Sequence, residues 1–238
     1  MQVTVLGGCG AWPAAGQACS AFLVELEGYR LLLDLGYSVV PRLLERVDAT
    51  EIDAVYITHG HPDHCADLNP LLRARALRDD PAGPLDVYAP PGALNAVLAL
   101  DRPGMLSSAY RLHEFEPGQA LRLGPFAAAT CLVPHWLPNA AIRLSTKDYA
   151  LAYTGDGGPC AEMSELARGA DLLLAEASYV DEVPGDSRGR LSTARDAGRL
   201  AHAAGVGKLM LTHLMHGQDP GAAKRAAAEE YAGEIANA

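Results

Sequence analysis

Residues 58–64 read Thr-His-Gly-His-Pro-Asp-His, and this stretch decides how the rest of the chain is interpreted. It follows the apolar run at residues 54–57, which has the composition of a buried strand, so the histidines fall in a loop at a strand end. Residues in such loops more often take part in binding or catalysis than in core packing. A shared metal ion is the most economical explanation for three imidazoles and a carboxylate so close together. We interpret the adjoining Cys65 as a small buried residue rather than a ligand.

The amino-acid composition limits which classes of molecule the protein can be expected to bind. The chain has 238 residues and a net charge of −10, from 19 Lys plus Arg and 29 Asp plus Glu. Its length suits one domain, residues 1–238, and no segment has the composition of a linker. The acidic balance argues against duplex nucleic acid or an anionic membrane, because both need clustered Lys and Arg. We therefore expect a small-molecule substrate.

The spacing of the cysteines and the length of the apolar runs indicate the cellular compartment in which the protein works. The five cysteines are widely spaced and form no Cys-x-x-Cys pair. The N-terminus lacks a signal-peptide pattern, and no apolar run has the length of a transmembrane helix. We expect a reduced, cytoplasmic setting and no membrane partner.

Hydrophobic periodicity predicts two halves, each rich in strands at first and alternating between strands and helices afterwards. In the first half we expect strands at residues 3–6, 21–26, 29–33, 54–57 and 87–89, and helices at 39–47, 67–77 and 92–100. In the second half we expect strands at 110–115, 120–123, 126–133, 141–144, 150–153, 172–175 and 209–211, and helices at 160–168, 193–204 and 221–231. This order is typical of two sheets with helices outside.

Other metal-competent side chains follow apolar, strand-like runs in the second half: His135, Asp156, Glu176 and His213. Each has an ordinary explanation when taken singly, because Asp156 could form a turn and a lone histidine is commonly a core or surface residue. Together with residues 58–64 they supply five histidines and two aspartates on candidate strand ends. If those ends converge on one edge, the set is enough to hold two divalent ions.

These motifs resemble the metallo-β-lactamase superfamily, and within it the branch of ribonuclease Z, PhnP-type phosphodiesterases and cyclic-nucleotide phosphodiesterases. The resemblance rests on the His-x-His-x-Asp-His spacing, on His135, Asp156 and His213 in their contexts, and on Leu-Leu-Leu-Asp-Leu-Gly at residues 31–36. It implies an α/β fold, the four-layer αββα sandwich. It also implies that one ion is held by His59, His61 and His135, and the other by Asp63, His64 and His213, with Asp156 bridging.

The resemblance further implies a chemistry for these two divalent ions. Zinc is favoured for this ligand set, with manganese or iron as alternatives. A hydroxide shared by the ions would be the nucleophile, and Asp63 would help to orient it. A homodimer is the expectation for the family.

One position departs from the family pattern. The ribonuclease Z branch carries a further histidine that protonates the leaving group beside a glutamate. Glu176 stands at the glutamate position, whereas Leu191 stands where that histidine is expected. Either the leaving group needs little acid help or another residue supplies the proton, and His216 is the nearest substitute in the sequence.

We expect a dinuclear-metal hydrolase that favours a phosphodiester, which includes cyclic nucleotides. The alternative on the same site is a carboxylic ester, lactone or thioester. An iron-dependent redox enzyme and a tRNA 3′-processing endonuclease are less favoured, the latter because the acidic chain has no basic arm to grip RNA.

Overall fold

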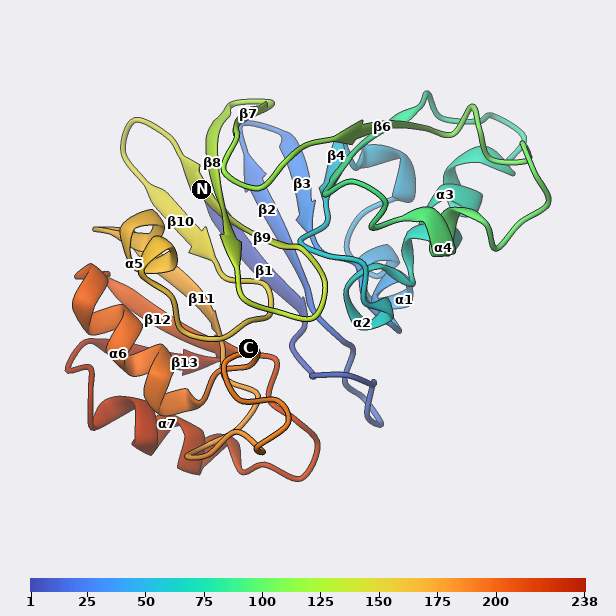
Figure 1. The fold of residues 1–238 in the computed structure, drawn as a ribbon. Coiled ribbons are helices and arrows are strands. Elements are labelled where there is room, and N and C mark those ends of the chain that lie inside the picture. The colour runs from blue at the N-terminus through green and yellow to red at the C-terminus, as the bar shows by residue number, and fades with distance from the viewer. The chain divides into compact units, whose positions relative to one another are not determined.

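The computed structural model describes residues 1–238, which form two compact units, Met1–Glu116 and Pro117–Ala238. Each unit contains one mixed β-sheet and its own helices, labelled in Figure 1. Within each sheet, strand-rich segments come before alternating strands and helices, as expected. The strand expected at residues 110–115 in the second half lies instead at the edge of the first unit's sheet, as Tyr110–Glu114.

The sheet of the first unit begins as an antiparallel meander and continues in parallel. Its strands are β1 (Gln2–Gly7), β2 (Ala21–Leu26), β3 (Tyr29–Leu33), β4 (Ala54–Tyr56), β5 (Leu85–Ala89) and β6 (Tyr110–Glu114), hydrogen-bonded in chain order. Glu27 and Gly28 form the turn of the hairpin between β2 and β3, with φ of 51° and 85°. A two-residue turn with both φ values positive matches the twist of the flanking strands.

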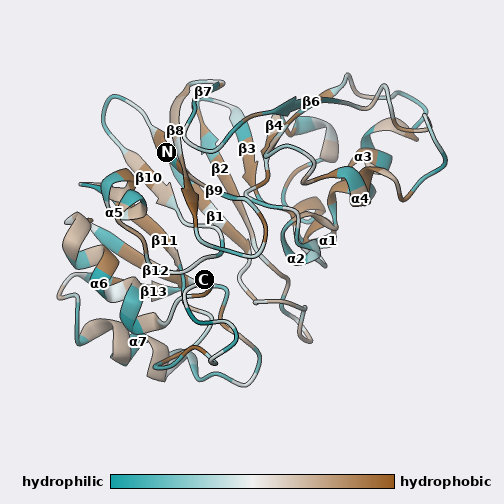
Figure 2. Cartoon of the chain, viewed as in Figure 1, coloured by the Kyte–Doolittle hydropathy of each residue, from teal (hydrophilic) through white to brown (hydrophobic).

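The helices of the first unit cover one face of its sheet. They are α1 (Val39–Leu44), α2 (Pro62–Cys65), α3 (Leu68–Ala76) and α4 (Asn95–Leu98), with a 3₁₀ turn at Ala49–Glu51. Buried side chains of α1 and α3, such as Leu43 and Leu71, join Leu32 and Val55 of the strands in one apolar cluster. Figure 2 shows α3 changing between hydrophobic and hydrophilic residues along its length, as expected for a helix with one buried side.

The sheet of the second unit has the same division, with antiparallel strands first and parallel strands afterwards. Its strands are β7 (Ala120–Leu123), β8 (Phe126–Val133), β9 (Asn139–Ser145), β10 (Ala150–Tyr153), β11 (Leu172–Glu176), β12 (Lys208–Thr212) and β13 (Glu234–Asn237). They follow chain order across the sheet, antiparallel from β7 to β10 and parallel from β10 to β13.

The helices of the second unit lie on one side of its sheet in Figure 1: α5 (Ala161–Ala167), α6 (Ala194–Ala204) and α7 (Pro220–Ala228). Thr193 and Asp196 form a capping box that starts α6, and Gly205 ends it with φ 62°. Small buried residues such as Ala197 and Ala201 let α6 pack closely on the strands. No helix in the chain is long and apolar enough to cross a membrane.

The central strands are buried on both faces. Leu32 and Leu173 contribute to the helix-side clusters, while the alternate residues Leu31, Leu33 and Leu174 are fully buried as well. Successive side chains of a strand point to opposite faces, so strands covered on both sides read as continuous apolar runs. The Leu-Leu-Leu runs that the sequence shows in β3 and β11 have this origin.

Several local features differ from the sequence prediction. Helix α4 covers only Asn95–Leu98 of the predicted residues 92–100. Helix α1 ends at Leu44 rather than at residue 47, and the single-turn α2 and the terminal strand β13 were not expected. Both unpredicted elements are only four residues long, which is too short to show a hydrophobic period. β13 owes its place to pairing with β12, which is a contact between residues distant in sequence.

Candidate metal centre

Parallel pairing gathers the conspicuous residues of the first unit at one edge of its sheet. Asp34 directly follows β3, and residues 58–64 follow β4, its parallel neighbour. The carboxyl ends of parallel strands meet at the same edge, where open α/β sheets commonly bind ligands. The predicted histidine stretch therefore lies beside Asp34, which the sequence did not mark as a site residue.

Asp34 is a fully buried carboxylate that organises this edge. It accepts hydrogen bonds from the Thr58 backbone N–H at 2.7 Å, from the Thr58 hydroxyl at 2.9 Å, and from His64 Nδ1 at 2.7 Å. Its φ of 58° is a left-handed conformation that a non-glycine residue adopts at a cost of about 1 kcal/mol or more. These contacts fix the His64 ring with Nε2 as its remaining nitrogen.

The Thr58 hydroxyl also orients the ring of His59. It lies 3.0 Å from His59 Nδ1, and because its one proton goes to Asp34, it accepts the proton of that nitrogen. His59 Nε2 lies 3.1 Å from His61 Nδ1. Tetrahedral zinc with Zn–N bonds of about 2.0–2.1 Å would separate two ligand nitrogens by roughly 3.3 Å, so the pair suits one ion.

Asp63 is held from its backbone and from its side chain. Its Oδ2 accepts the Ala11 N–H at 2.8 Å and lies 3.7 Å from His64 Nε2. A Cβ on Gly36 would lie 1.9 Å from the Asp63 carbonyl oxygen, so only glycine permits this approach. The neighbouring Cys65 is 3 % exposed and belongs to the apolar cluster, and burial raises the pKa of its thiol to about 12. These properties fit a small core residue.

The second unit gathers its predicted residues in the same way. Asp156 and His213 follow the parallel strands β10 and β12, and Glu176 ends β11 between them. β8 runs in the same direction as β10, because each is antiparallel to β9, so His135 after β8 lies at the same edge. One edge of this sheet thus carries all of these residues.

His213 and Asp156 are buried and face each other. His213 Nε2 lies 3.0 Å from Asp156 Oδ2, and His213 Nδ1 lies 2.9 Å from the Ser178 hydroxyl. His213 has a φ of 60°, the same strained left-handed conformation as Asp34. Strain of this kind persists only where surrounding contacts fix it, and it is common at functional sites.

Among the predicted site residues of the second unit's buried edge, His135 is half-buried. Its Nδ1 donates to the Arg190 carbonyl oxygen at 2.9 Å, and Arg190 Nη1 returns a hydrogen bond to the His135 carbonyl oxygen at 3.1 Å. The Arg190 guanidinium also lies over the Trp136 ring, 5.9 Å from its centre. A backbone oxygen therefore orients the His135 ring.

Glu176 has partners other than a histidine. Its carboxylate accepts the N–H of Ser192 at 3.1 Å, the N–H of Gly157, and the hydroxyl of Ser178 at 2.6 Å. Burial raises the pKa of this carboxyl above its ordinary value, the Asp156 carboxylate adds to the rise, and the hydrogen bonds oppose it. Leu191, at the position of the expected histidine, is itself buried.

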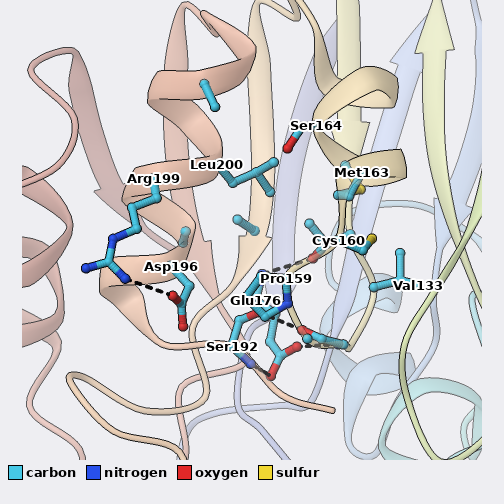
Figure 3. Close-up of a pocket in the computed structure, with 16 residues that line it drawn as sticks. Val133, Pro159, Cys160, Met163, Ser164, Glu176, Ser192, Asp196, Arg199 and Leu200 are labelled. Carbon is cyan, nitrogen blue, oxygen red and sulfur yellow. Dashed lines mark hydrogen bonds and ion pairs between the residues drawn. The ribbon is translucent and has the colours of Figure 1, made fainter. Parts of the chain in front are cut away.

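A cavity of about 210 Å³ opens beside this glutamate, between α5 and α6. Figure 3 shows Glu176 and Ser192 close together, with Val133, Cys160, Met163 and Leu200 as further lining residues. The lining is mostly apolar, and Arg199 of α6 pairs with Asp196 of the same helix. The oxygens of Glu176 are already engaged with donors, so we assign the cavity no ligand.

His216 lies in the turn after β12, three residues beyond His213, and its side chain is exposed. It therefore shares the second unit with His213 and Asp156 but is not part of their buried cluster.

The histidines share one arrangement that suits a metal centre. The Nδ1 atoms of His59, His64, His135 and His213 each contact an oxygen of the protein. Metal-binding histidines typically bond one ring nitrogen to a protein oxygen, which fixes the tautomer and leaves the other nitrogen for the ion. The donor set, imidazole and carboxylate, is the one that zinc and related divalent ions prefer. The chain thus contains groups of histidines and aspartates able to bind metal.

Comparison with known proteins agrees with these motifs. A family profile described as "Beta-lactamase superfamily domain" matches residues 29–214. A protein of Bacillus subtilis named "Probable metallo-hydrolase YhfI" is 32 % identical over 223 residues, which cover 91 % of this chain and 88 % of that protein. The chain belongs to the metallo-β-lactamase superfamily. It is accordingly a metal-dependent hydrolase.

Solved structures confirm the fold and the expected branch. The crystal structure of the metallo-β-lactamase fold protein YhfI matches with a TM-score of 0.89 and 31 % identity, covering 99 % of this chain and 95 % of that one. This match confirms the αββα sandwich. A ribonuclease Z of Mycobacterium bovis is 28 % identical over 265 residues, covering 99 % and 94 % of the two chains. A diphosphatase from the PhnP family shares the fold, with a TM-score of 0.77 at 20 % identity, covering 99 % and 94 %.

Proposed function

We propose that the chain is a dinuclear-metal hydrolase of small phosphodiesters. One ion would be held by His59, His61 and His135, and the other by Asp63, His64 and His213, with Asp156 between them. The observation that carries the proposal is the anchoring of Nδ1 in both units, which prepares histidines from β4, β8 and β12 as ligands. Zinc is the favoured metal.

Bound divalent ions would supply a nucleophilic water of lowered pKa and would stabilise the negative charge that develops on the reacting group. The chain's own residues would prepare this chemistry. Asp34 and Thr58 hold the imidazoles in one tautomer, and the Ala11 N–H fixes Asp63, whose carboxylate can orient a water molecule. Burial of these groups excludes competing solvent and strengthens their electrostatic effect.

The relatives favour phosphodiesters over carboxylic esters. Ribonuclease Z, at 28 % identity, is named for cleavage of RNA, whose backbone is a phosphodiester. The net charge of −10 argues for a small substrate in place of a polyanion. An ester, lactone or thioester is the second candidate, because the missing histidine at Leu191 favours substrates whose leaving group needs no proton. The cytoplasmic setting and the homodimer stay predictions.

A matched panel of substrates separates these candidates. The metal-loaded protein is assayed with bis(p-nitrophenyl) phosphate, 2′,3′- and 3′,5′-cyclic nucleotides, p-nitrophenyl esters, a lactone and a thioester. We expect hydrolysis of phosphodiesters with the highest kcat/KM. Turnover of the esters or thioesters together with inactivity on every phosphodiester would reject the phosphodiester assignment.

We further propose that His216 protonates poor leaving groups. His216→Ala is expected to lower kcat by about 10²–10⁴-fold for a cyclic nucleotide, whose alkoxide leaving group needs a proton. It should change kcat little for bis(p-nitrophenyl) phosphate, because p-nitrophenolate leaves without one. His202→Ala, which removes a histidine exposed on α6, is the control. Equal rates and an unchanged pH profile for His216→Ala on both substrates would remove His216 from the mechanism.

A further inference from the structure

Ser178 connects a buried carboxylate to a histidine in the second unit. Its hydroxyl donates to Glu176 Oε1 at 2.6 Å and lies 2.9 Å from His213 Nδ1. Ser178 is fully buried, and Glu176 and His213 are at most 3 % exposed. The contacts join residues 35 positions apart in sequence, so they depend on the pairing of β11 with β12.

The available protons determine which group donates and which accepts in each of these hydrogen bonds. Glu176 receives two backbone N–H groups, from Gly157 and Ser192, and these can only donate. With the carboxylate as acceptor, the single hydroxyl proton of Ser178 goes to Glu176 at the short distance of 2.6 Å. The hydroxyl oxygen can then only accept from His213, so His213 Nδ1 carries a proton, and Nε2 is the ring nitrogen that faces Asp156 Oδ2, 3.0 Å away.

The first unit contains the same sequence of groups. The Thr58 hydroxyl donates to Asp34 and lies 3.0 Å from His59 Nδ1, as Ser178 lies between Glu176 and His213. Both units therefore use a carboxylate, a hydroxyl and an imidazole in that order. The same arrangement occurs on two separate sheets. Because packing alone would not require it, we interpret the arrangement as a means of orienting the histidine.

We infer that Ser178 and Glu176 are positioning residues for His213: they fix its Nδ1–H tautomer and aim Nε2 toward the metal. This role rests on the proposed function of His213 as a ligand. It also gives Glu176 a role, the orientation of His213 through Ser178, although Leu191 occupies the position of its expected histidine partner. His213 needs such support, because its φ of 60° places it in a strained backbone conformation.

The inference predicts weaker metal binding when the hydroxyl is removed. Ser178→Ala is expected to raise the zinc dissociation constant of the site that includes His213 by about 10- to 100-fold, the usual effect of losing a group that orients a ligand. Ser178→Thr, which keeps the hydroxyl, should recover most of the affinity. Ser20→Ala is the matched control, because Ser20 is equally buried and its hydroxyl makes no hydrogen bond.

Competition titration with a chelating dye measures these constants, and nitrogen-15 NMR of the metal-free wild-type protein at pH 8 reads the His213 tautomer directly. Protonation of Nδ1 together with the loss in Ser178→Ala supports the inference. An Nδ1 that carries no proton, or zinc affinity of folded Ser178→Ala within about twofold of wild type, overturns it. If the wild-type protein binds no metal, the proposed function fails instead, so the two failures are distinguishable. The NMR measurement decides even if both Ser178 variants fail to fold.

Discussion

Asp156→Ala should lower kcat for phosphodiesters by about a thousandfold or more, because a catalytic metal supplies several kcal/mol of transition-state stabilisation and each 1.4 kcal/mol is tenfold in rate. Asp156 is buried and lies 3.0 Å from His213 Nε2, in the place proposed for the bridging ligand. Its loss should also release metal, which elemental analysis of the purified variant can measure.

Asp148→Ala is the control for this substitution, since Asp148 is an exposed acid of the same unit. It should leave both activity and metal content as in the wild-type protein. An Asp156→Ala variant that keeps its metal and at least a tenth of wild-type kcat would show that Asp156 is a turn residue, the ordinary explanation that the sequence left open.

Asp34→Ala should destabilise the fold as well as the metal site. The substitution leaves the Thr58 N–H, the Thr58 hydroxyl and His64 Nδ1 buried without their acceptor. We expect a loss of about 3–5 kcal/mol in the free energy of unfolding, the usual result of removing one partner from a buried charged network. Urea denaturation of the metal-free protein measures this change.

Asp34→Asn provides the comparison, because asparagine tolerates the left-handed backbone and keeps an acceptor oxygen. It should lose less stability than Asp34→Ala but bind metal more weakly than the wild-type protein, as His64 loses its carboxylate partner. A metal-free Asp34→Ala protein within about 1 kcal/mol of wild type would contradict the account of this network.

Much of the architecture could be predicted because local signals agree with the fold. The hairpin at Glu27 and Gly28 is marked by its turn residues, and helix α6 by its capping box and terminal glycine. The histidine stretch at 58–64 stood out because its ligands are adjacent in sequence. His135, Asp156 and His213 could be named because each follows an apolar strand.

The groups that orient the histidines could not be predicted from local patterns. Ser178 meets His213 across 35 positions and Asp34 meets His64 across 30, and no period or motif connects such pairs. The Arg190 carbonyl oxygen that holds His135 belongs to the backbone, which carries no residue-specific signal. Strand pairing creates these contacts, so they emerge only with the three-dimensional fold.

Metal stoichiometry tests the central claim most directly. The protein is stripped with a chelator, reloaded with excess zinc, desalted and analysed by plasma emission spectrometry against its measured concentration. The account predicts about two zinc ions per chain and recovery of phosphodiesterase activity in proportion to the metal bound. A folded, reloaded protein that retains no metal, or one that is equally active with and without it, would contradict the account.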